Sequence, residues 1–106
     1  MRAYFFTNFY LNSLSQGIQP AHCIADMFVR YNKPNPTFAD TASRNRLYDW
    51  ADNHKTIICL NGGANQDIHD TFVRLKVIGE ALHLPYGDFH EDHYSLGGIK
   101  TCCVIS

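Results

Sequence analysis

Two features of the sequence could hold the phosphates of a small ligand. Arg30 ends the stretch QGIQPAHCIADMFVR (residues 16–30), which is typical of a loop followed by a helix. Its guanidinium could bind a phosphate, although the helix dipole also favours a cation at a helix C-terminus without any ligand. The turn Asn61-Gly62-Gly63 precedes a predicted helix, so its N–H groups could face an anion. It lacks the spacing of a P-loop or a dinucleotide fingerprint, and a plain tight turn also explains it.

A second group of residues could bind the base and the sugar of a nucleotide. Phe89, in the polar stretch DFHEDHY, could stack on adenine, a contact worth about 1–3 kcal/mol, or could be an inward-facing strand residue. Asp92, Ser95 and Lys100 follow on one predicted loop and strand and could bind ribose hydroxyls, base edges or phosphate. Singly, each could also be a turn or surface residue. His22 could donate to the ligand or could be a structural residue at a helix start.

The sequence favours neither a metal site nor covalent chemistry. His90 and His93 would not share a face on a strand or loop as two histidines one helical turn apart do, and no third ligand lies at a recognisable spacing. Cys23 and His22 cannot act as nucleophile and base, because adjacent helix residues point about 100° apart. We therefore expect no metal, no cofactor and no catalytic residue.

The hydrophobic pattern predicts the elements that would carry these residues. The aromatic-rich segment 2–8 predicts a first strand. Pro20 fits the first turn of a helix over residues 20–31. The buried face of that helix would consist of residues at helical spacing, namely Ala21, Ile24, Ala25 and Phe28. The two prolines of YNKPNPT then end it.

Two further helices are expected. One spans residues 41–52, is capped by Asp40 or Thr41, and buries Leu47, Trp50 and Ala51. The other starts at Asn65 or Asp67 and runs to about Leu82. Its apolar face is wide and would comprise Ile68, Phe72, Leu75, Gly79 and Leu82, with Val73, Val77 and Ala81 at its margins.

Three more strands complete the expected fold. Residues 55–60 (KTIICL) predict a buried strand, residues 86–90 a short one, and residues 99–106 the last one, after the polar turn EDHYSLGG. The order of elements predicts an α/β sandwich with a mixed four-stranded sheet and about three helices. The length of 106 residues and the apolar fraction of 45% suit a single ligand-binding domain over residues 1–106.

Charge and cysteine usage restrict the partners and the compartment. Nine Lys+Arg against ten Asp+Glu give no basic excess, which disfavours a long nucleic acid. The cysteines form no C-x-x-C pair, and Cys102 and Cys103 would point to opposite faces of a strand. We interpret all four, which also include Cys23 and Cys59, as small buried apolar residues in a reducing cytoplasm. No signal peptide and no apolar run of about 20 residues is present, so we expect no membrane partner.

Three segments together resemble the archaeal- and eukaryote-type peptidyl-tRNA hydrolases over nearly the whole chain: GIQPAHCIADMF, LYDWADNHKTIICLN and LPYGDFHEDHYSLGGIKTCCVI. That family opens its first helix with Gly-Lys-x-Ala-Ala-Gln, and the lysine belongs to its active site. Here Ile18 takes the lysine position, and an aliphatic side chain cannot polarise an ester carbonyl. Asp92 and Ser95 correspond to the family's acidic and hydroxyl residues. The resemblance implies the hydrolase scaffold without the hydrolysis.

A closer resemblance is to the first-described family of phage sponges that counter the bacterial Thoeris defence. The segments YFFTNFYLNSLSQGIQPAH, WADNHKTIICLNGG and FHEDHYSLGGIKTC look like that family. The resemblance implies non-covalent capture of a glycocyclic ADP-ribose signal, without cleavage, in the cytoplasm of the bacterial host. It also implies dimers or larger homo-oligomers with pockets at subunit contacts. Whether cyclic oligonucleotides bind too is left open.

Two alternative functions remain open at this point. A peptidyl-tRNA hydrolase or related esterase would need a replacement cation at the helix start, and neither Ile18 nor Gln19 supplies one. An inhibitor that binds a host protein could instead reuse the surface of the sheet. The expected ligand-binding residues are Arg30, Asn61, Gly62, Phe89, Asp92, Ser95, Lys100 and His22.

Overall fold

The computed structural model describes residues 1–8, 13–90 and 100–106. Along the chain it forms β1 (Ala3–Asn8), α1 (Ser13–Tyr31), α2 (Phe38–Asp49), a π-helical turn η1 (Trp50–His54), β2 (Ile57–Gly63), α3 (Asn65–Leu82), β3 (Tyr86–His90) and β4 (Lys100–Ile105). Two expected site residues, Asp92 and Ser95, lie outside the described residues. No helix within the described ranges is long and apolar enough to cross a membrane.

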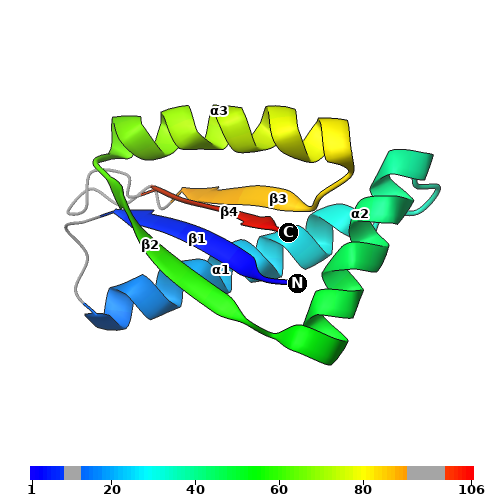
Figure 1. Ribbon diagram of the computed structural model, residues 1–106, viewed down its shortest axis with the longest axis horizontal. Helices are drawn as coiled ribbons and strands as arrows, with labels where there is room; N and C mark the ends of the chain where they lie inside the picture. The colour runs from blue at the N-terminus through cyan, green and yellow to red at the C-terminus, as the bar shows by residue number, and fades with distance from the viewer. Residues whose placement is uncertain (9–12, 91–99) are drawn as a thin grey trace.

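The four strands form one mixed sheet in the order β2-β1-β4-β3. β1 runs parallel to β2 and antiparallel to β4, which also pairs antiparallel with β3. α1 and α3 pack on opposite faces of this sheet (Figure 1). The prediction of an α/β domain with a mixed four-stranded sheet and three helices is therefore confirmed.

The alternation of side chains along β4 divides the core between the two faces. Cys103 and Ile105 join the cluster under α1, together with Phe5 and Met27. Cys102 and Val104 instead join a cluster under α3, which includes Ile68, Leu75 and Tyr86. Because successive strand residues point to opposite faces, the prediction that Cys102 and Cys103 face opposite ways is confirmed.

α1 differs from its prediction in start and in face. The helix begins at Ser13, so Pro20 lies inside it and not in its first turn. Its buried stripe contains Cys23, Met27 and Tyr31 at four-residue intervals. Of the expected inward residues, Ile24 and Phe28 are partly buried against this cluster, and Ala21 and Ala25 are exposed. Sulfur-containing and aromatic side chains remove more apolar area from water than two alanines do. The burial of this stripe therefore rotates the helix away from the predicted face.

α2 begins earlier than predicted, at Phe38, and is capped by Thr37 instead of Asp40 or Thr41. The Thr37 hydroxyl accepts a hydrogen bond from the backbone N–H of Asp40 at 3.1 Å, which is the usual N-cap arrangement. Leu47 and Trp50 are buried as predicted. Trp50 lies in η1, where its indole Nε1–H donates to the Thr56 carbonyl at 2.9 Å and joins the turn to the start of β2.

β2 was predicted to be buried, and this prediction is wrong. The strand lies at the edge of the sheet with only β1 beside it, so Ile57 keeps 47% and Leu60 38% of its surface exposed. Cys59 is also exposed, so the expectation that all four cysteines are buried fails at this position. A short apolar run predicts a strand, but it does not say whether the strand lies at the centre or at an edge.

α3 has the predicted limits but a narrower buried face. Ile68, Leu75 and Gly79 are buried. Four residues expected in the apolar face are exposed, namely Val73, Val77, Ala81 and Leu82. Only one side of α3 rests on the sheet, so only the residues on that side are buried. β3 has the predicted bounds, and β4 begins one residue and ends one residue inside the predicted strand.

Candidate functional site

The ends of four strands meet at one edge of the sheet. Asn8 at the end of β1 lies opposite Gly63 at the end of β2. Thr7 lies opposite Thr101 of β4, next to Lys100. After β1 the chain continues to α1 on one face, whereas after β2 it continues to α3 on the other face (Figure 1). Such a point, where connections from adjacent parallel strands diverge, is where open α/β sheets bind ligands.

Asn65, the first residue of α3, links three elements at this point. Its Oδ1 accepts a hydrogen bond from Asn8 Nδ2 at 2.6 Å and from the backbone N–H of Lys100 at 3.3 Å. These bonds fix the end of β1 and the start of β4 against the start of α3. They also fix the point from which the partly exposed Lys100 side chain extends. Neither Asn8 nor Asn65 was predicted as a site residue. Asn8 lies at the end of the predicted first strand, and Asn65 at the predicted start of a helix.

The predicted turn at residues 61–63 is wrong, because Asn61, Gly62 and Gly63 are the last residues of β2, which spans residues 57–63 and not 55–60. Asn61 Oδ1 accepts from the N–H of Gly63 at 2.9 Å, and Asp67 Oδ2 accepts from the N–H of Ala64 at 2.9 Å. One of the amides expected to face an anion, that of Gly63, is therefore occupied, and so is the amide of Ala64 at the N-cap of α3. Gly63 has φ = +85°, a conformation that glycine adopts without strain. Asn61 itself is exposed.

The two predicted aromatic residues come together. The rings of His22 on α1 and Phe89 on β3 make an edge-to-face contact with centroids 4.6 Å apart. Phe89 lies opposite Thr101 on the α1 face, whereas Lys100, the next residue along β4, faces the α3 side, as Cys102 does. His22 is exposed and Phe89 is only partly buried against the α1 cluster. The strand-end site therefore comprises His22 and Phe89 on the α1 face, Lys100 on the α3 face, and Asn61 and Gly62 at the end of β2, so a ligand contacts all of them by lying across the strand ends.

Arg30 does not belong to this group. It lies near the end of α1, where its Nη2 donates to the Tyr86 hydroxyl at 2.8 Å and its guanidinium stands 4.4 Å from the centre of the Tyr86 ring. Tyr86 in turn donates to Glu80 Oε1 at 2.9 Å. Tyr86 lies opposite Val104, which pairs with Tyr4 near the start of β1. Arg30 is thus at the end of the sheet opposite to Asn61, Gly62 and Lys100.

Carboxylates surround Arg30. One cavity of about 200 Å³ is lined by Arg30, Asp26 and Asp88, with Met27 and Gly87. A second, of about 130 Å³, has Arg30, Asp40 and Glu80 among its lining residues. Burial would lower the pKa of Arg30, but Tyr31, Tyr86 and Asp88 raise it, and the net change is upward. A phosphate placed here would meet more negative than positive side chains, so the expected phosphate-clamp role of Arg30 finds no support.

The buried thiols are poor nucleophiles. Burial raises the pKa of Cys102 to about 12 and that of Cys103 well above its ordinary value, so both are protonated at neutral pH. Neither Cys102 nor Cys103 is therefore an activated nucleophile. Within residues 1–8, 13–90 and 100–106, no three His, Cys, Asp or Glu side chains are arranged to hold a metal.

Together these features define a small α/β domain with a polar strand-end site at the switch point of a mixed sheet. No family model matches the chain, and no curated protein matches it.

Proposed function

We propose that the protein binds a compact phosphorylated nucleotide at the strand-end site and releases it chemically unchanged. The observation that carries this proposal is the switch point between β1 and β2, where the connections to α1 and α3 diverge to opposite faces. Five of the six expected ligand residues that the structure describes lie at this end, which are His22, Asn61, Gly62, Phe89 and Lys100.

Each group has a defined part in the proposed complex. Lys100 supplies the cation for the phosphates, and its strand position is fixed by the bond of its N–H to Asn65. The side-chain amide of Asn61 donates to a phosphate or a ribose hydroxyl, since its Oδ1 is already bound by Gly63. Phe89 and His22 present ring surface to the base.

The ligand class we propose is a glycocyclic ADP-ribose signal, which makes the protein a sponge of the kind that counters the Thoeris defence. The sequence resemblance supports this ligand, and the chemistry of the site supports capture over cleavage. Ile18, at the position of the hydrolase lysine, is 42% exposed on α1 and carries no charge. A site that binds the ground state and the transition state of its ligand equally well does not accelerate the cleavage of that ligand.

Thermal unfolding with and without cyclic ADP-ribose isomers tests the proposal. We expect a rise in Tm that grows with ligand concentration, and recovery of intact ligand after heating. Lys100→Ala should reduce the shift, because it removes the proposed cation. Lys76→Ala, an exposed lysine in the middle of α3, is the matched control and should leave the shift unchanged.

Other outcomes of these experiments would support one of the alternative functions. Linearised nucleotide after incubation would make the protein an enzyme, and turnover of peptidyl-tRNA that depends on Asp92 would make it a hydrolase. A Tm that no cyclic nucleotide changes would overturn nucleotide capture and favour binding of a host protein.

A further inference from the structure

Two fully buried thiols meet in the core beneath α1. The Sγ atoms of Cys23 on α1 and Cys103 on β4 are 2.7 Å apart, although the residues are separated by 80 positions in the chain. Neither side chain has any exposed surface. The contact therefore joins the first helix to a central strand of the sheet.

The distance decides what this pair can do. Non-bonded heavy atoms prefer separations of roughly 3.5–4.0 Å, whereas the sulfur atoms of a disulfide are about 2.05 Å apart. Cys23 and Cys103, at 2.7 Å, are closer than packing alone favours and less than 1 Å from bonding distance. A metal does not fit between them, because two thiolates on one tetrahedral zinc ion stand about 3.8 Å apart at Zn–S distances near 2.3 Å.

Met27 and Gly87 lie between the Cys103 thiol and a neighbouring cavity. The Sγ of Cys103 lies 3.1 Å from Met27 Sδ and 3.7 Å from the Gly87 carbonyl oxygen. Met27 and Gly87 also line the cavity of about 200 Å³ beside Arg30. The packing is tight here, because a Cβ at Gly87 would stand 2.8 Å from Met27 Cγ and 3.9 Å from Cys103 Sγ. Cys103 has no exposed surface and does not line the cavity, so a small oxidant reaches it when the flexible Met27 side chain moves aside.

We propose that Cys23 and Cys103 are a site of oxidative modification, at which hydrogen peroxide produces an intramolecular disulfide that joins α1 to β4. Cys103 first loses its proton, which its raised pKa makes slow at neutral pH. Its thiolate then attacks one peroxide oxygen, the O–O bond breaks, and the released hydroxide takes up the proton, so that a sulfenic acid and one water form. The sulfur of Cys23 then attacks Cys103, the S–O bond breaks, and a second water leaves. Two thiols lose two hydrogens and two electrons, and one peroxide becomes two waters.

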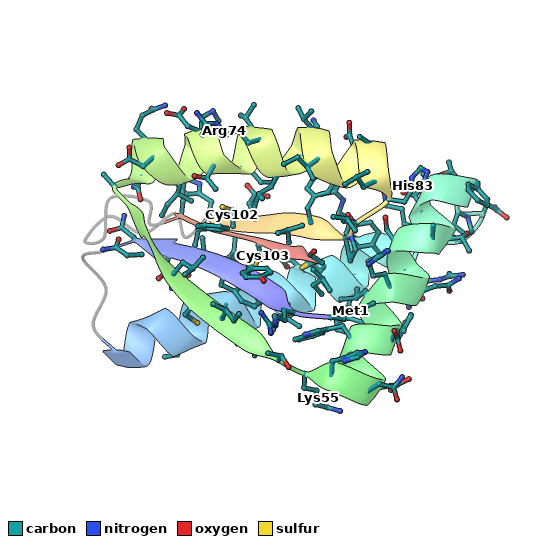
Figure 2. All side chains as sticks on the ribbon, viewed as in Figure 1. Met1, Lys55, Arg74, His83, Cys102 and Cys103 are labelled. Carbon is teal, nitrogen blue, oxygen red and sulfur yellow. The ribbon has the colours of Figure 1, made fainter. Side chains whose placement is uncertain are left out.

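The other two cysteines are placed so that they do not compete. Cys102 is the neighbour of Cys103 on β4 (Figure 2), but it faces α3, with its Sγ 3.8 Å from the Ile68 carbonyl oxygen. Cys59 is exposed on β2, on a strand that does not carry either thiol of the pair. Since His22 precedes Cys23, the cross-link also fixes the part of α1 that contacts Phe89.

The test uses the full chain with Cys59→Ser, so that no exposed thiol reacts. We expect peroxide to lower the intact mass by about 2 Da, the mass of two hydrogens per disulfide, and peptide mapping to find residues 23 and 103 in one cross-linked species. Dithiothreitol should reverse the change. Tm should be higher for the oxidised form than for the reduced form, because the cross-link restricts the unfolded chain.

Two further variants in the Cys59→Ser background serve as controls. Adding Cys102→Ser should leave the cross-link intact, and adding Cys23→Ser should abolish it. A disulfide between Cys102 and Cys103, or Cys103 recovered as a thiol or as a sulfinic acid alone, would overturn the proposal. Mapping of the Cys59→Ser protein decides the matter by itself if the Cys23→Ser variant does not fold.

Discussion

Tyr31 satisfies both backbone groups of Tyr86 with one hydroxyl. Its oxygen accepts from the Tyr86 N–H at 3.1 Å and donates to the Tyr86 carbonyl at 3.2 Å. Tyr86 begins the edge strand β3, so these groups have no further strand to bind on that side. The Tyr86 hydroxyl meanwhile joins Arg30 to Glu80. Arg30, Tyr31 and Tyr86 are therefore a structural connection between α1, β3 and α3.

Tyr31→Phe should lower the free energy of unfolding by about 1–3 kcal/mol, because it leaves buried backbone groups of Tyr86 without partners. Tyr48→Phe is the matched control. Tyr48 is 40% exposed and only makes a ring contact with Phe28, which phenylalanine can keep. Urea unfolding of the three proteins measures the difference. Equal midpoints for the two variants would contradict the role of the Tyr31 hydroxyl.

The raised pKa of Cys102 predicts sensitivity to alkali. Burial raises the pKa of this thiol in the folded protein from 9.0 to about 12. The folded state thus holds the proton more tightly than the unfolded state, so this contribution to stability is complete below pH 9 and is lost as the pH rises toward 12. We expect the urea midpoint to fall between pH 9 and pH 11, and to fall less steeply in Cys102→Ala. Identical slopes for the two proteins would exclude Cys102 as a cause.

Residue types suggested candidates but did not show which of them would be neighbours. The sequence indicated His22 and Phe89 separately, and their ring contact depends on the placement of α1 over β3. Arg30 was indicated because a guanidinium suits a phosphate, but its carboxylate neighbours Asp40 and Asp88 come from other parts of the chain. Charge around a side chain is a property of the packed structure, so no local pattern could have predicted it.

Helices α1 and α3 carry glycines in contrasting surroundings. Gly17 lies in α1 with nothing within 4 Å of the place where a Cβ would stand. Gly79 lies in α3 against β3, where a Cβ would collide with the Tyr86 ring and stand 3.0 Å from the Leu84 carbonyl oxygen. The absence of a side chain at Gly79 lets α3 approach the sheet closely. At Gly17 the absence of a side chain only gives the unfolded chain more conformational freedom.

The same substitution should therefore have opposite effects at these two positions. Gly17→Ala should stabilise the protein by about 0.5–1 kcal/mol, because alanine is the better helix former. Gly79→Ala should destabilise it by about 1–3 kcal/mol, because the added methyl group forces α3 and Tyr86 apart. Thermal unfolding of both variants provides the comparison. A stabilising Gly79→Ala would mean that α3 and β3 are not packed as described.

Element types were predictable, whereas their faces and environments were not. The limits of α3 and β3 followed from clear start and stop signals, such as Asn65 and Pro85. The start of α1 was misplaced because Pro20 looks like a first-turn residue, yet it sits within a helix that already begins at Ser13. The exposed position of β2 could not be predicted, since which strand lies at an edge depends on pairing between distant segments.

At the scale of the whole molecule, β2 leaves one side of the sheet open. Ala3 N–H donates to the Thr56 carbonyl at 2.9 Å, so the backbone groups of Thr56 point toward β1. Because these directions alternate along a strand, the N–H and C=O groups of Ile57 and Cys59 point outward. No described residue pairs with them. Many proteins protect such an edge with charged residues, but β2 carries none.

This open edge predicts self-association through β2. Two copies related by a two-fold axis can pair their β2 strands antiparallel and extend the sheet across the interface. The axis would lie near the middle of the strand, so the partly exposed Leu60 of each copy would stand near its counterpart. Leu60→Lys should therefore weaken association, since like charges across paired strands repel. Val77→Lys is the matched control, because it replaces a similarly exposed side chain on α3, away from the edge. Light scattering after size-exclusion chromatography at several concentrations should show wild type and Val77→Lys as oligomers and Leu60→Lys as a monomer. A wild-type protein that stays monomeric at every concentration would show that β2 is not an interface between copies.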